Sequence, residues 1–242
     1  MNSGIYSALT GNIAAMKRLD VISNNLANVN TPGFKKDRMT FESMLQQVNA
    51  QPKANGGTDA PIYAETAFFT DYAQGPVKQT GNTFDLALDG DGFFVVTTPD
   101  GQKAYTRQGN FRLDSTGKLV TADGNQVGGG ITITGGKVEI NAKGEIFVDG
   151  GQVGTLEVVD FPKPYAFQKL GSALFVPADP QVTSQPVKGE PVRQGYMEES
   201  NVSAVQEMVQ MIETNRYFEM CTKVVKAYDD LTAKAANEIG KL

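Results

Sequence analysis

Apolar residues near the start of the chain recur every three or four positions, which is the period of an amphipathic helix. The stripe between residues 5 and 29 consists of Ile5, Leu9, Ile13, Met16, Leu19, Ile22, Leu26 and Val29. Thr31 precedes Pro32 and is therefore disfavoured in the α region, and Pro32-Gly33 suits the centre of a type II turn. The pattern predicts a helix that ends just before this turn.

A second helical pattern occupies the C-terminal end. Ser200 or Asn201 can cap it, and its first apolar stripe contains Val205, Met208, Val209 and Ile212. The phase slips near Asn215-Arg216. The stripe then resumes, close to heptad spacing, with Tyr217, Cys221, Val224, Tyr228, Leu231, Ala235, Ile239 and Leu242. We expect the two terminal helices to bury their stripes against each other and to need further neighbours, because an isolated helix pair is marginal in water.

Between the helices the pattern changes to short alternating runs, such as Phe84 to Leu88 and Phe93 to Val96, which indicate strands. Residues 113–119 and 140–146 match in their apolar, Asx and glycine positions, and both are predicted to be hairpins. Asp89-Gly90-Asp91-Gly92 predicts another hairpin turn. The middle of the chain therefore favours a meandering antiparallel sandwich or barrel.

Residues 46–79 contain several prolines and glycines and no sustained period, which is typical of an extended connector. Its aromatic residues Phe68, Phe69 and Tyr72 are expected to pack on another part of the molecule. The expected fold class is α+β: a discontinuous domain of paired, coiled-coil-like terminal helices and a central antiparallel all-β domain. The expected boundaries are 1–45 for the N-terminal helix and turn, 46–79 for the connector, 80–196 for the β-domain and 197–242 for the C-terminal helix.

Composition narrows the function. The 242 residues include 22 basic and 27 acidic side chains, and the net charge of −5 argues against a general nucleic-acid or anionic-membrane binder. One cysteine and no histidine exclude disulfides within the chain, Cys/His zinc sites and Ser-His or Cys-His catalysis. No apolar run reaches the roughly 20 residues of a membrane-spanning helix. No cleaved secretory signal is visible, so composition alone favours the cytoplasm.

The remaining candidate chemistry is weak. Asp85, Asp89 and Asp91 suggest a glycosidase acid pair or a calcium loop, but Ala87 breaks the alternation that a calcium loop requires. The glycines of 128–130 are not followed by the Lys and Ser or Thr of a phosphate loop. Met208, Met211 and Met220 suit either an adaptable partner-binding face or buried helix packing. We therefore predict no catalytic residues, metal, cofactor or small-molecule substrate.

Four of the eight residues from Ser23 to Asn30 are asparagine. An exposed amide contributes little, whereas a satisfied amide in a crowded interface fixes register. This favours Asn24, Asn25 and Asn28 as residues that set the register between neighbouring chains. The alternative is a frayed helix end followed by an asparagine-rich turn.

These residues carry a family resemblance. The segment 22–35, read as ISNNLANVNTPGFK, resembles the N-terminal signature of bacterial flagellar axial proteins of the rod and hook. Residues 84–94 followed by 105–111, and residues 199–205, resemble further motifs of that family. The segment 216–220, read as RYFEM, resembles the proximal-rod branch more than the distal-rod branch, although the 90–94 motif is also typical of distal-rod and hook proteins.

The resemblance implies a structural, non-enzymatic subunit of the basal-body rod that transmits torque and assembles with proximal and distal rod subunits. It also implies a periplasmic location and export through the flagellum's own apparatus without a cleaved signal, which replaces the cytoplasmic expectation. Pattern and resemblance together give the expected assembly interface: Ile22, Asn24, Asn25, Leu26, Asn28, Val29, Thr31, Pro32, Gly33, Phe34, Val205, Met208, Ile212, Val224, Tyr228 and Leu231.

Two other classes of function stay open at this point. The first is a soluble β-rich binding module that dimerises through its terminal helices. The second is a carboxylate-dependent hydrolase, for which the sequence offers no convergent acid pair.

Overall fold

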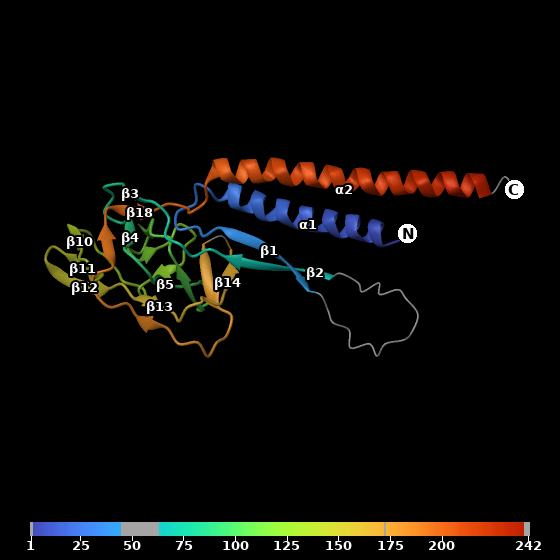
Figure 1. The fold of residues 1–242 in the computed structure, drawn as a ribbon. Helices are drawn as coiled ribbons and strands as arrows, with labels where there is room; N and C mark the ends of the chain where they lie inside the picture. Colours follow the sequence, from blue (N-terminus) through green and yellow to red (C-terminus); the bar gives the residue numbers. More distant parts are fainter. Residues whose placement is uncertain (1, 45–62, 172, 240–242) are drawn as a thin grey trace. The chain divides into compact units, whose positions relative to one another are not determined.

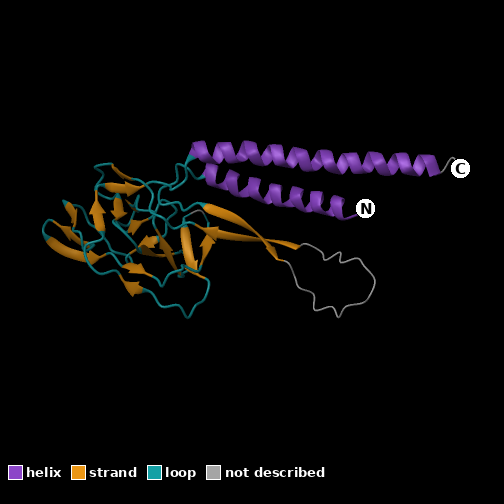
Figure 2. Cartoon of the chain, viewed as in Figure 1, coloured by secondary structure: helices purple, strands orange, loops and turns teal. Residues whose placement is uncertain are grey.

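The computed structural model describes residues 2–44, 63–171 and 173–239, and it has an α+β fold (Figure 2). The chain forms two compact units. One, the helical unit, takes in Met1–Ala27, Asp37–Asp71 and Ser203–Leu242. The other, the β unit, takes in Asn28–Lys36 and Tyr72–Val202.

The helical unit contains two long antiparallel helices, α1 (Asn2–Ala27) and α2 (Ala204–Ile239) (Figure 1). Both were predicted, and the phase slip near Asn215 does not interrupt α2. The unit also contains a hairpin of β1 (Asp37–Met44) and β2 (Tyr63–Thr70), with Asp37 opposite Thr70. Residues 46–62 of the predicted connector lie outside the described residues, and β2 is a regular strand because it is paired along its whole length with β1.

The β unit is built from short antiparallel strands, as the alternating pattern predicts. Its largest sheet has nine strands: β5 (Phe93–Thr97), β6 (Lys103–Thr106), β7 (Arg112–Leu113), β8 (Leu119–Val120), β9 (Gln126–Val127), β13 (Val158–Asp160), β14 (Phe167–Leu170), β15 (Leu174–Pro177) and β16 (Gln185–Pro186). The smaller sheets contain β3 (Val77–Gln79) with β18 (Tyr196–Glu198), β4 (Leu86–Leu88) with β17 (Val192–Gln194), and β10 (Val138–Ile140), β11 (Glu145–Val148) and β12 (Gly151–Thr155).

The two similar sequence segments form hairpins, which confirms that prediction. Leu113 lies opposite Leu119 in the β7–β8 hairpin, and Ile140 lies opposite Ile146 in the β10–β11 hairpin. In the first turn an Asp114 Oδ1 accepts hydrogen bonds from the backbone N–H groups of residues 116 and 118, both at 2.8 Å. Asn141 Oδ1 does the same for residues 143 and 145, at 3.0 and 2.9 Å. The hydrogen bond from the Thr116 side chain is the main reason why the pKa of Asp114 is lowered.

The predicted hairpin turn at Asp89–Gly92 is wrong. β4 and β5, on either side of it, do not pair with each other, because β4 pairs with β17 and β5 pairs with β6, β9 and β13. The Asp89 N–H donates to the Pro191 carbonyl at 2.7 Å, and Gly92 has φ of 118°. The segment therefore carries the chain from one sheet to another, and glycine allows the backbone to change direction.

Two hydrophobic cores fill the β unit. The larger contains aliphatic residues of many strands, including Leu86, Val96 and Ile146. The smaller is aromatic and centres on Phe93 and Phe175, both about fully buried, with Tyr72 packed against it. Of the three aromatic residues expected to pack on another part of the molecule, Tyr72 does so, with its ring edge-on to that of Phe175 at 5.4 Å between centroids. Phe68 and Phe69 are instead 54% and 45% exposed.

Candidate assembly interface

Small residues form the face of α1 that packs on α2. A Cβ atom on Gly11 would lie 3.0 Å from Tyr217 Oη and 3.1 Å from Cys221 Sγ, and one on Gly4 would meet the Tyr228 ring. Ala8 and Ala15, in heptad register with these glycines, are buried. We call this contact the seam. Because the inward side chains of α1 are so small, the two helix backbones approach closely along it.

The seam side of α2 carries polar and adaptable side chains. Among the α2 residues whose burial is described, the buried ones are Glu207, Thr214 and Cys221, which are spaced by seven residues. Thr214 donates to the Gln210 carbonyl of its own helix at 2.7 Å. Tyr217 is hydrogen-bonded to Cys221, and this bond is the main reason why the pKa of the Tyr217 hydroxyl is raised. Most of the large apolar residues of α2 therefore lie outside the seam and are exposed.

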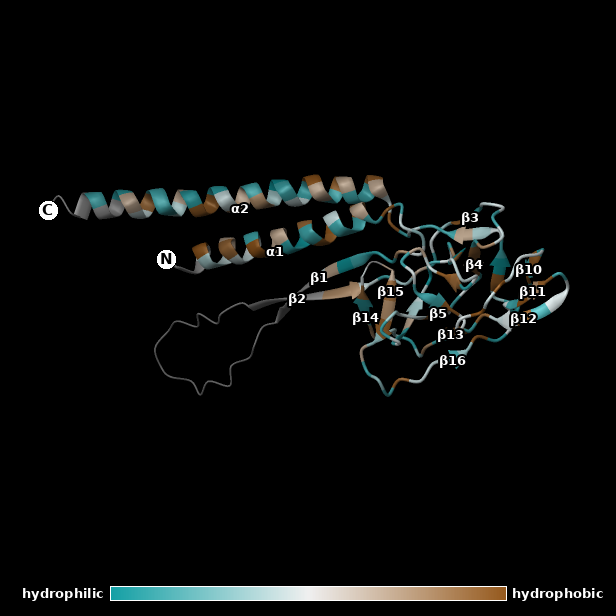
Figure 3. Ribbon diagram, turned by 180° about the vertical axis from the view of Figure 1, so that it is seen from behind, coloured by the Kyte–Doolittle hydropathy of each residue, from teal (hydrophilic) through white to brown (hydrophobic). Residues whose placement is uncertain are grey.

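The first half of the α1 stripe, Leu9, Ile13 and Met16, faces away from the seam, whereas Ile22 is buried. This corrects in part the expectation that the two stripes bury against each other. On α1 the exposed residues are Tyr6, Leu9, Ile13 and Met16, with exposed fractions from 48% to 64%. On the first half of α2 they are Val205, Met208, Val209 and Ile212, and on the second half Tyr217, Met220, Val224 and Leu231. Figure 3 shows hydrophobic bands recurring along both helices. The physical reason is that the glycine and alanine face allows a closer approach than the leucine and isoleucine face.

Asn25 holds the end of α1 by hydrogen bonds within the helical unit. Its Oδ1 accepts from the Asp37 N–H at 2.9 Å, and its Nδ2 donates to the Asp37 carbonyl at 2.9 Å and to Glu207 Oε2 at 3.3 Å. The side chain is 2% exposed. One amide thus joins α1, the start of β1 and the first turns of α2, so the hydrogen bonds of Asn25 are made inside the chain.

The turn after α1 belongs to the β unit and is built internally as well. The Thr31 hydroxyl donates to Asn28 Oδ1 at 3.1 Å. Gly33 has φ of +66°, and a Cβ atom there would collide with the backbone of Arg107 and Gln108. Phe34 is 1% exposed, and Lys169 Nζ lies 4.6 Å from its ring centroid. Gly33 and Phe34 are therefore covered by their own chain.

Three buried charged side chains fix this turn, and we call them the charge cluster. Lys35 Nζ lies 2.6 Å from Glu198 Oε1, and Arg107 Nη1 lies 3.2 Å from Glu198 Oε2. All three side chains are at most 3% exposed. Lys35 also donates to the Ala73 carbonyl at 2.7 Å, and Arg107 donates to the Gly90 carbonyl at 2.7 Å. A shared carboxylate thus offsets the cost of burying two cations.

Backbone groups complete the charge cluster. The Gly75 N–H donates to Glu198 Oε1 at 3.0 Å, and the Gly33 N–H donates to the Glu198 carbonyl at 2.9 Å. The Arg107 guanidinium lies over the Phe93 ring at 5.4 Å. Arg107 Nε is buried and has no hydrogen-bond partner among the described residues. The cluster therefore ties the turn after α1 to the segment that precedes α2 in sequence.

The expected interface residues separate into three groups. Ile22, Asn25, Gly33 and Phe34 are buried, and Leu26, Asn28, Val29, Thr31, Pro32 and Tyr228 are partly buried. Asn24, Val205, Met208, Ile212, Val224 and Leu231 are exposed. Val224 and Leu231 were expected to be buried in the stripe. The second half of the α2 stripe instead flanks the seam, about a quarter turn from the buried Cys221, and the Tyr217 hydroxyl lies beside Gly11.

Sequence reasoning missed the charge cluster, although its members lie within or beside the family motifs. Lys35 ends the 22–35 segment, Arg107 lies inside 105–111, and Glu198 directly precedes 199–205. Lys35 and Arg107 are each the one charged residue of their motif, whereas Glu198 adjoins a motif that itself begins with Glu199. That shared position was the available signal, but sequence alone does not show that three separate motifs meet.

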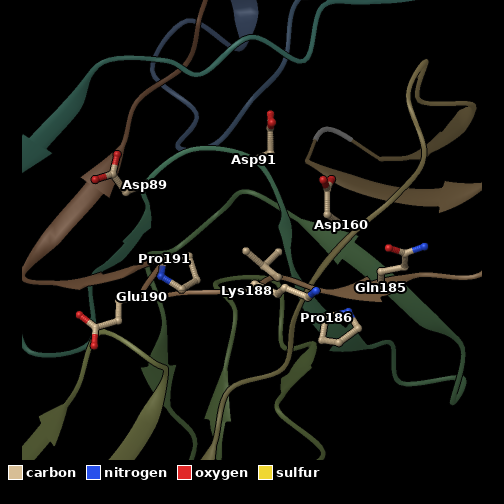
Figure 4. Close-up of a pocket in the computed structure, with 9 residues that line it drawn as sticks. Asp89, Asp91, Asp160, Gln185, Pro186, Lys188, Glu190 and Pro191 are labelled. Carbon is tan, nitrogen blue, oxygen red and sulfur yellow. The ribbon is translucent and has the colours of Figure 1, made fainter.

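The carboxylates that were weighed as an acid pair are engaged with other groups. Asp85 accepts a hydrogen bond from Asn82 at 3.2 Å, Asp89 pairs with Arg193, and Asp91 pairs with Lys163 at 2.6 Å. The nearby Asp160 accepts a hydrogen bond from Tyr165 at 2.8 Å. Asp89, Asp91 and Asp160 line a cavity of about 580 Å³ (Figure 4). Burial, followed by the hydrogen bond to Asp160, raises the pKa of Tyr165. The cavity thus contains carboxylates in ion pairs or hydrogen bonds.

In the part of the chain that the structure describes, neither helix is long and apolar enough to cross a membrane. No group of three or more Cys, Asp or Glu side chains within the described ranges is arranged to hold a metal ion. Among the described residues, the exposed apolar side chains outside the seam are therefore the surface feature that indicates a binding partner.

Three protein-family models match separate parts of the chain. Residues 5–35 match the family described as flagella basal body rod protein. Residues 87–148 match the D1 domain of the flagellar hook protein FlgE/F/G family, and residues 193–238 match the C-terminal family of flagellar basal body rod FlgEFG proteins. The first and third matches cover α1 with the turn after it, and most of α2.

Individual relatives match nearly the whole chain. The flagellar basal-body rod protein FlgG of Bacillus subtilis is 36% identical over 266 positions, covering 98% of this chain and 99% of the relative. FlgG of Borreliella burgdorferi is 33% identical and covers 98% of each chain. The flagellar basal-body rod protein FlgF of Caulobacter vibrioides is 32% identical over 253 positions and covers 100% of each chain.

Proposed function

The chain belongs to the flagellar basal-body rod proteins of the FlgF and FlgG type, and we propose that, as a structural subunit of the rod, it binds neighbouring rod subunits through the outward apolar faces of α1 and α2. The supporting observation is the exposure of large apolar side chains along both helices. Leu9, Ile13, Met16 and Ile212 are each about half exposed in the single chain. Apolar surface concentrated in this way marks an interaction site in a soluble protein.

The expected interface residues take different roles in this proposal. Val205, Met208, Ile212, Val224 and Leu231 contact neighbouring subunits, because they are exposed. Ile22, Asn25 and Tyr228 hold the helix pair in its coiled-coil-like arrangement, and Thr31, Pro32, Gly33 and Phe34 hold the turn after α1. Asn24 remains a candidate for register between subunits, whereas Asn25 and Asn28 act through their hydrogen bonds inside the chain.

Within the rod, we assign the chain to the proximal, FlgF-type position. The 216–220 motif supports this assignment. The alignments to two FlgF relatives span 249 and 253 positions with 99% and 100% of this chain covered, whereas those to the first three FlgG relatives span 258 to 266. FlgF relatives therefore need fewer gaps. The higher identity of the Bacillus FlgG, at 36%, supports the distal-rod alternative.

The proposal includes the location and the route of the subunit. The rod position implies passage through the flagellar export apparatus and a final place in the periplasmic part of the axle, and both rest on the family resemblance. A structural role without turnover agrees with the pairing of Asp89 and Asp91 with basic side chains.

The experiment replaces the chromosomal gene by variants and measures swimming together with recovery of the chain in isolated basal bodies. Ile212→Asp puts a charge on the exposed face, and we expect loss of both. Gln206→Asp is the matched control, because Gln206 is exposed and polar on the same helix, and it is expected to leave both nearly unchanged. Normal swimming of the Ile212→Asp strain would contradict the proposal.

A further inference from the structure

The exposed apolar residues of α2 fall into two patches on different sides of the helix. Patch one is Val205, Met208, Val209 and Ile212, and patch two is Tyr217, Met220, Val224 and Leu231. We propose that the two patches bind two different neighbours, and that patch one binds the α1 stripe of Leu9, Ile13 and Met16 in a second copy of this chain. This inference rests on the proposed function and deepens it.

The directions of the two patches follow from helix geometry. With roughly 3.6 residues per turn, patch one lies roughly opposite the buried Thr214. Patch two lies only about a quarter turn from the buried Cys221. The drift of a supercoiled helix is about 20° per heptad, which is too small to bring the two patches into line. One straight partner helix therefore cannot cover both.

The change of side coincides with the phase slip at Asn215-Arg216. Both residues are exposed, so the slip places polar side chains between the patches. α2 continues as one helix through this point. The slip therefore turns the apolar surface to another side of α2 without interrupting the helix, so one continuous helix presents an apolar patch to each of two neighbours.

The stripe on α1 is a suitable occupant for patch one. Leu9, Ile13 and Met16 are 48%, 50% and 56% exposed, and Tyr6 extends the stripe by a further turn. The stripe from Tyr6 to Met16 is about 15 Å long, against about 10 Å for patch one, at 1.5 Å per residue. The stripe thus spans the full length of patch one.

Charge favours patch one over patch two as the partner of α1. α1 carries Lys17, Arg18 and Asp20 and is therefore net basic. The α2 segment 204–215 has the exposed Glu213 and no basic residue, and its second carboxylate, Glu207, is buried and hydrogen-bonded to Asn25 inside the chain. The segment 216–239 contains four basic and four acidic residues, namely Arg216, Lys223, Lys226, Lys234, Glu219, Asp229, Asp230 and Glu238. The net basic helix therefore gains more from the first segment than from the second.

This contact is heterologous, which suits an extended assembly. The α1 stripe and patch one each point away from the seam, so they lie on opposite sides of the helix pair. A copy that binds one neighbour through its stripe keeps its own patch one open for the next. A twofold contact, in which patch one meets patch one, would close after two copies.

The experiment places a photo-crosslinking amino acid at single positions of the full chain in cells and analyses irradiated, isolated basal bodies. A label at Ile212 is expected to give a two-chain species whose crosslinked peptide comes from residues 6–18 of a second copy. The reciprocal label at Ile13 is expected to capture a peptide from 204–215. A label at Val224 is expected to capture a different segment, and a label at Glu213, which is exposed beside Ile212, serves as the directional control.

Each other outcome overturns the inference. These outcomes are capture of the same peptide by the Ile212 and Val224 labels, capture of residues 205–212 by Ile212, capture of a different rod protein by Ile212 and Ile13, and crosslinks within one chain only. Failure of the proposed function looks different, because the unlabelled chain would then be missing from isolated basal bodies.

Discussion

The helical unit and the β unit place their large side chains in opposite ways. In the β unit, Phe93, Phe94 and even the charged Lys35 and Glu198 are among the largest fully buried side chains. In the helical unit, small residues such as Gly11 and Ala15 lie inside the seam, Leu9, Ile13 and Met16 lie outside it, and Ile22 near the end of α1 is buried. The β unit thus buries its large apolar side chains within itself, whereas the helical unit leaves large apolar side chains exposed outside the seam.

The two units treat buried polar groups alike. Asn25 and Glu207 are hydrogen-bonded to each other in the helical unit, and Lys35 and Glu198 are paired in the β unit. Since an unpaired buried polar group is costly, such pairs fix one arrangement. Four sets of variants test the contrast between a self-sufficient unit and an incomplete one.

The largest effect is expected at the charge cluster. Glu198→Gln keeps the shape of the side chain but leaves Lys35 and Arg107 without the carboxylate, and we expect the free energy of unfolding of the β unit to fall by about 3–5 kcal/mol. Denaturant unfolding followed by tyrosine fluorescence measures it. Glu199→Gln is the control, because its pair with Lys78 is exposed and should contribute under about 1 kcal/mol. Equal losses in both variants would show that the cluster is not special.

The next effect concerns the turn after α1. Gly33→Ala introduces a Cβ at φ of +66°, against the backbone of residues 107 and 108, and should destabilise the β unit by more than about 2 kcal/mol. Gly81→Ala has a similar φ of +73° but no atom within 4 Å of the added Cβ, so it should cost only about 1–2 kcal/mol. Thermal unfolding of both variants separates collision from backbone strain. A Gly33→Ala loss no greater than that of Gly81→Ala would mean that the turn shifts freely.

A smaller effect is expected at the hydrogen-bonded end of α1. Asn25→Ala removes the partners of Glu207 and of the Asp37 backbone, and should destabilise the helical unit by about 1–3 kcal/mol. Hydrogen exchange of residues 15–25 in the full chain measures this loss. Ser23→Ala is the control, because Ser23 is exposed on the same helix. Unchanged exchange in the Asn25 variant would show that its hydrogen bonds do not hold α1.

The smallest effect on folding is expected on the outward face of α1. Ile13→Asp, at a position that is 50% exposed, should change the stability of the helix pair by under about 0.5 kcal/mol, although rod assembly is lost. Ala15→Asp, at a position that is 2% exposed, places a charge in the seam and should open the pair. Hydrogen exchange of residues 214–228 compares them. If Ile13→Asp opened the pair as strongly as Ala15→Asp, the stripe would belong to the seam.

Periodicity in the sequence was sufficient to predict both helices, the antiparallel strands and the two similar hairpins. Those features depend on neighbours within a few positions, as in the Asp114 and Asn141 turns. The rotation of α1 about its axis was predicted wrongly. The apolar stripe that includes Leu9 and Ile13 is the clearest sequence pattern in α1 and was expected to face α2. The face that contacts α2 is instead the one with Gly4 and Gly11, because these residues let the two helices approach closely.

Contacts between residues far apart in the sequence could not be predicted from local patterns either. Asp89–Gly92 has the local composition of a hairpin turn, yet β4 pairs with β17, about a hundred residues later. The charge cluster likewise joins residues 35, 107 and 198, and nothing in their local spacing indicates that they meet. The expected interface could be predicted as a set of apolar positions, but its division between seam and outward face required the three-dimensional arrangement.

The charge cluster also sets an order in time. Lys35 is synthesised early, Arg107 follows near the middle of synthesis, and Glu198 is added only when about four-fifths of the 242 residues have been made. Until Glu198 has been added, Lys35 and Arg107 have no shared carboxylate, and the Gly33 N–H in the turn after α1 has no Glu198 carbonyl to bind. The β unit therefore cannot complete this cluster until the last fifth of the chain is being made.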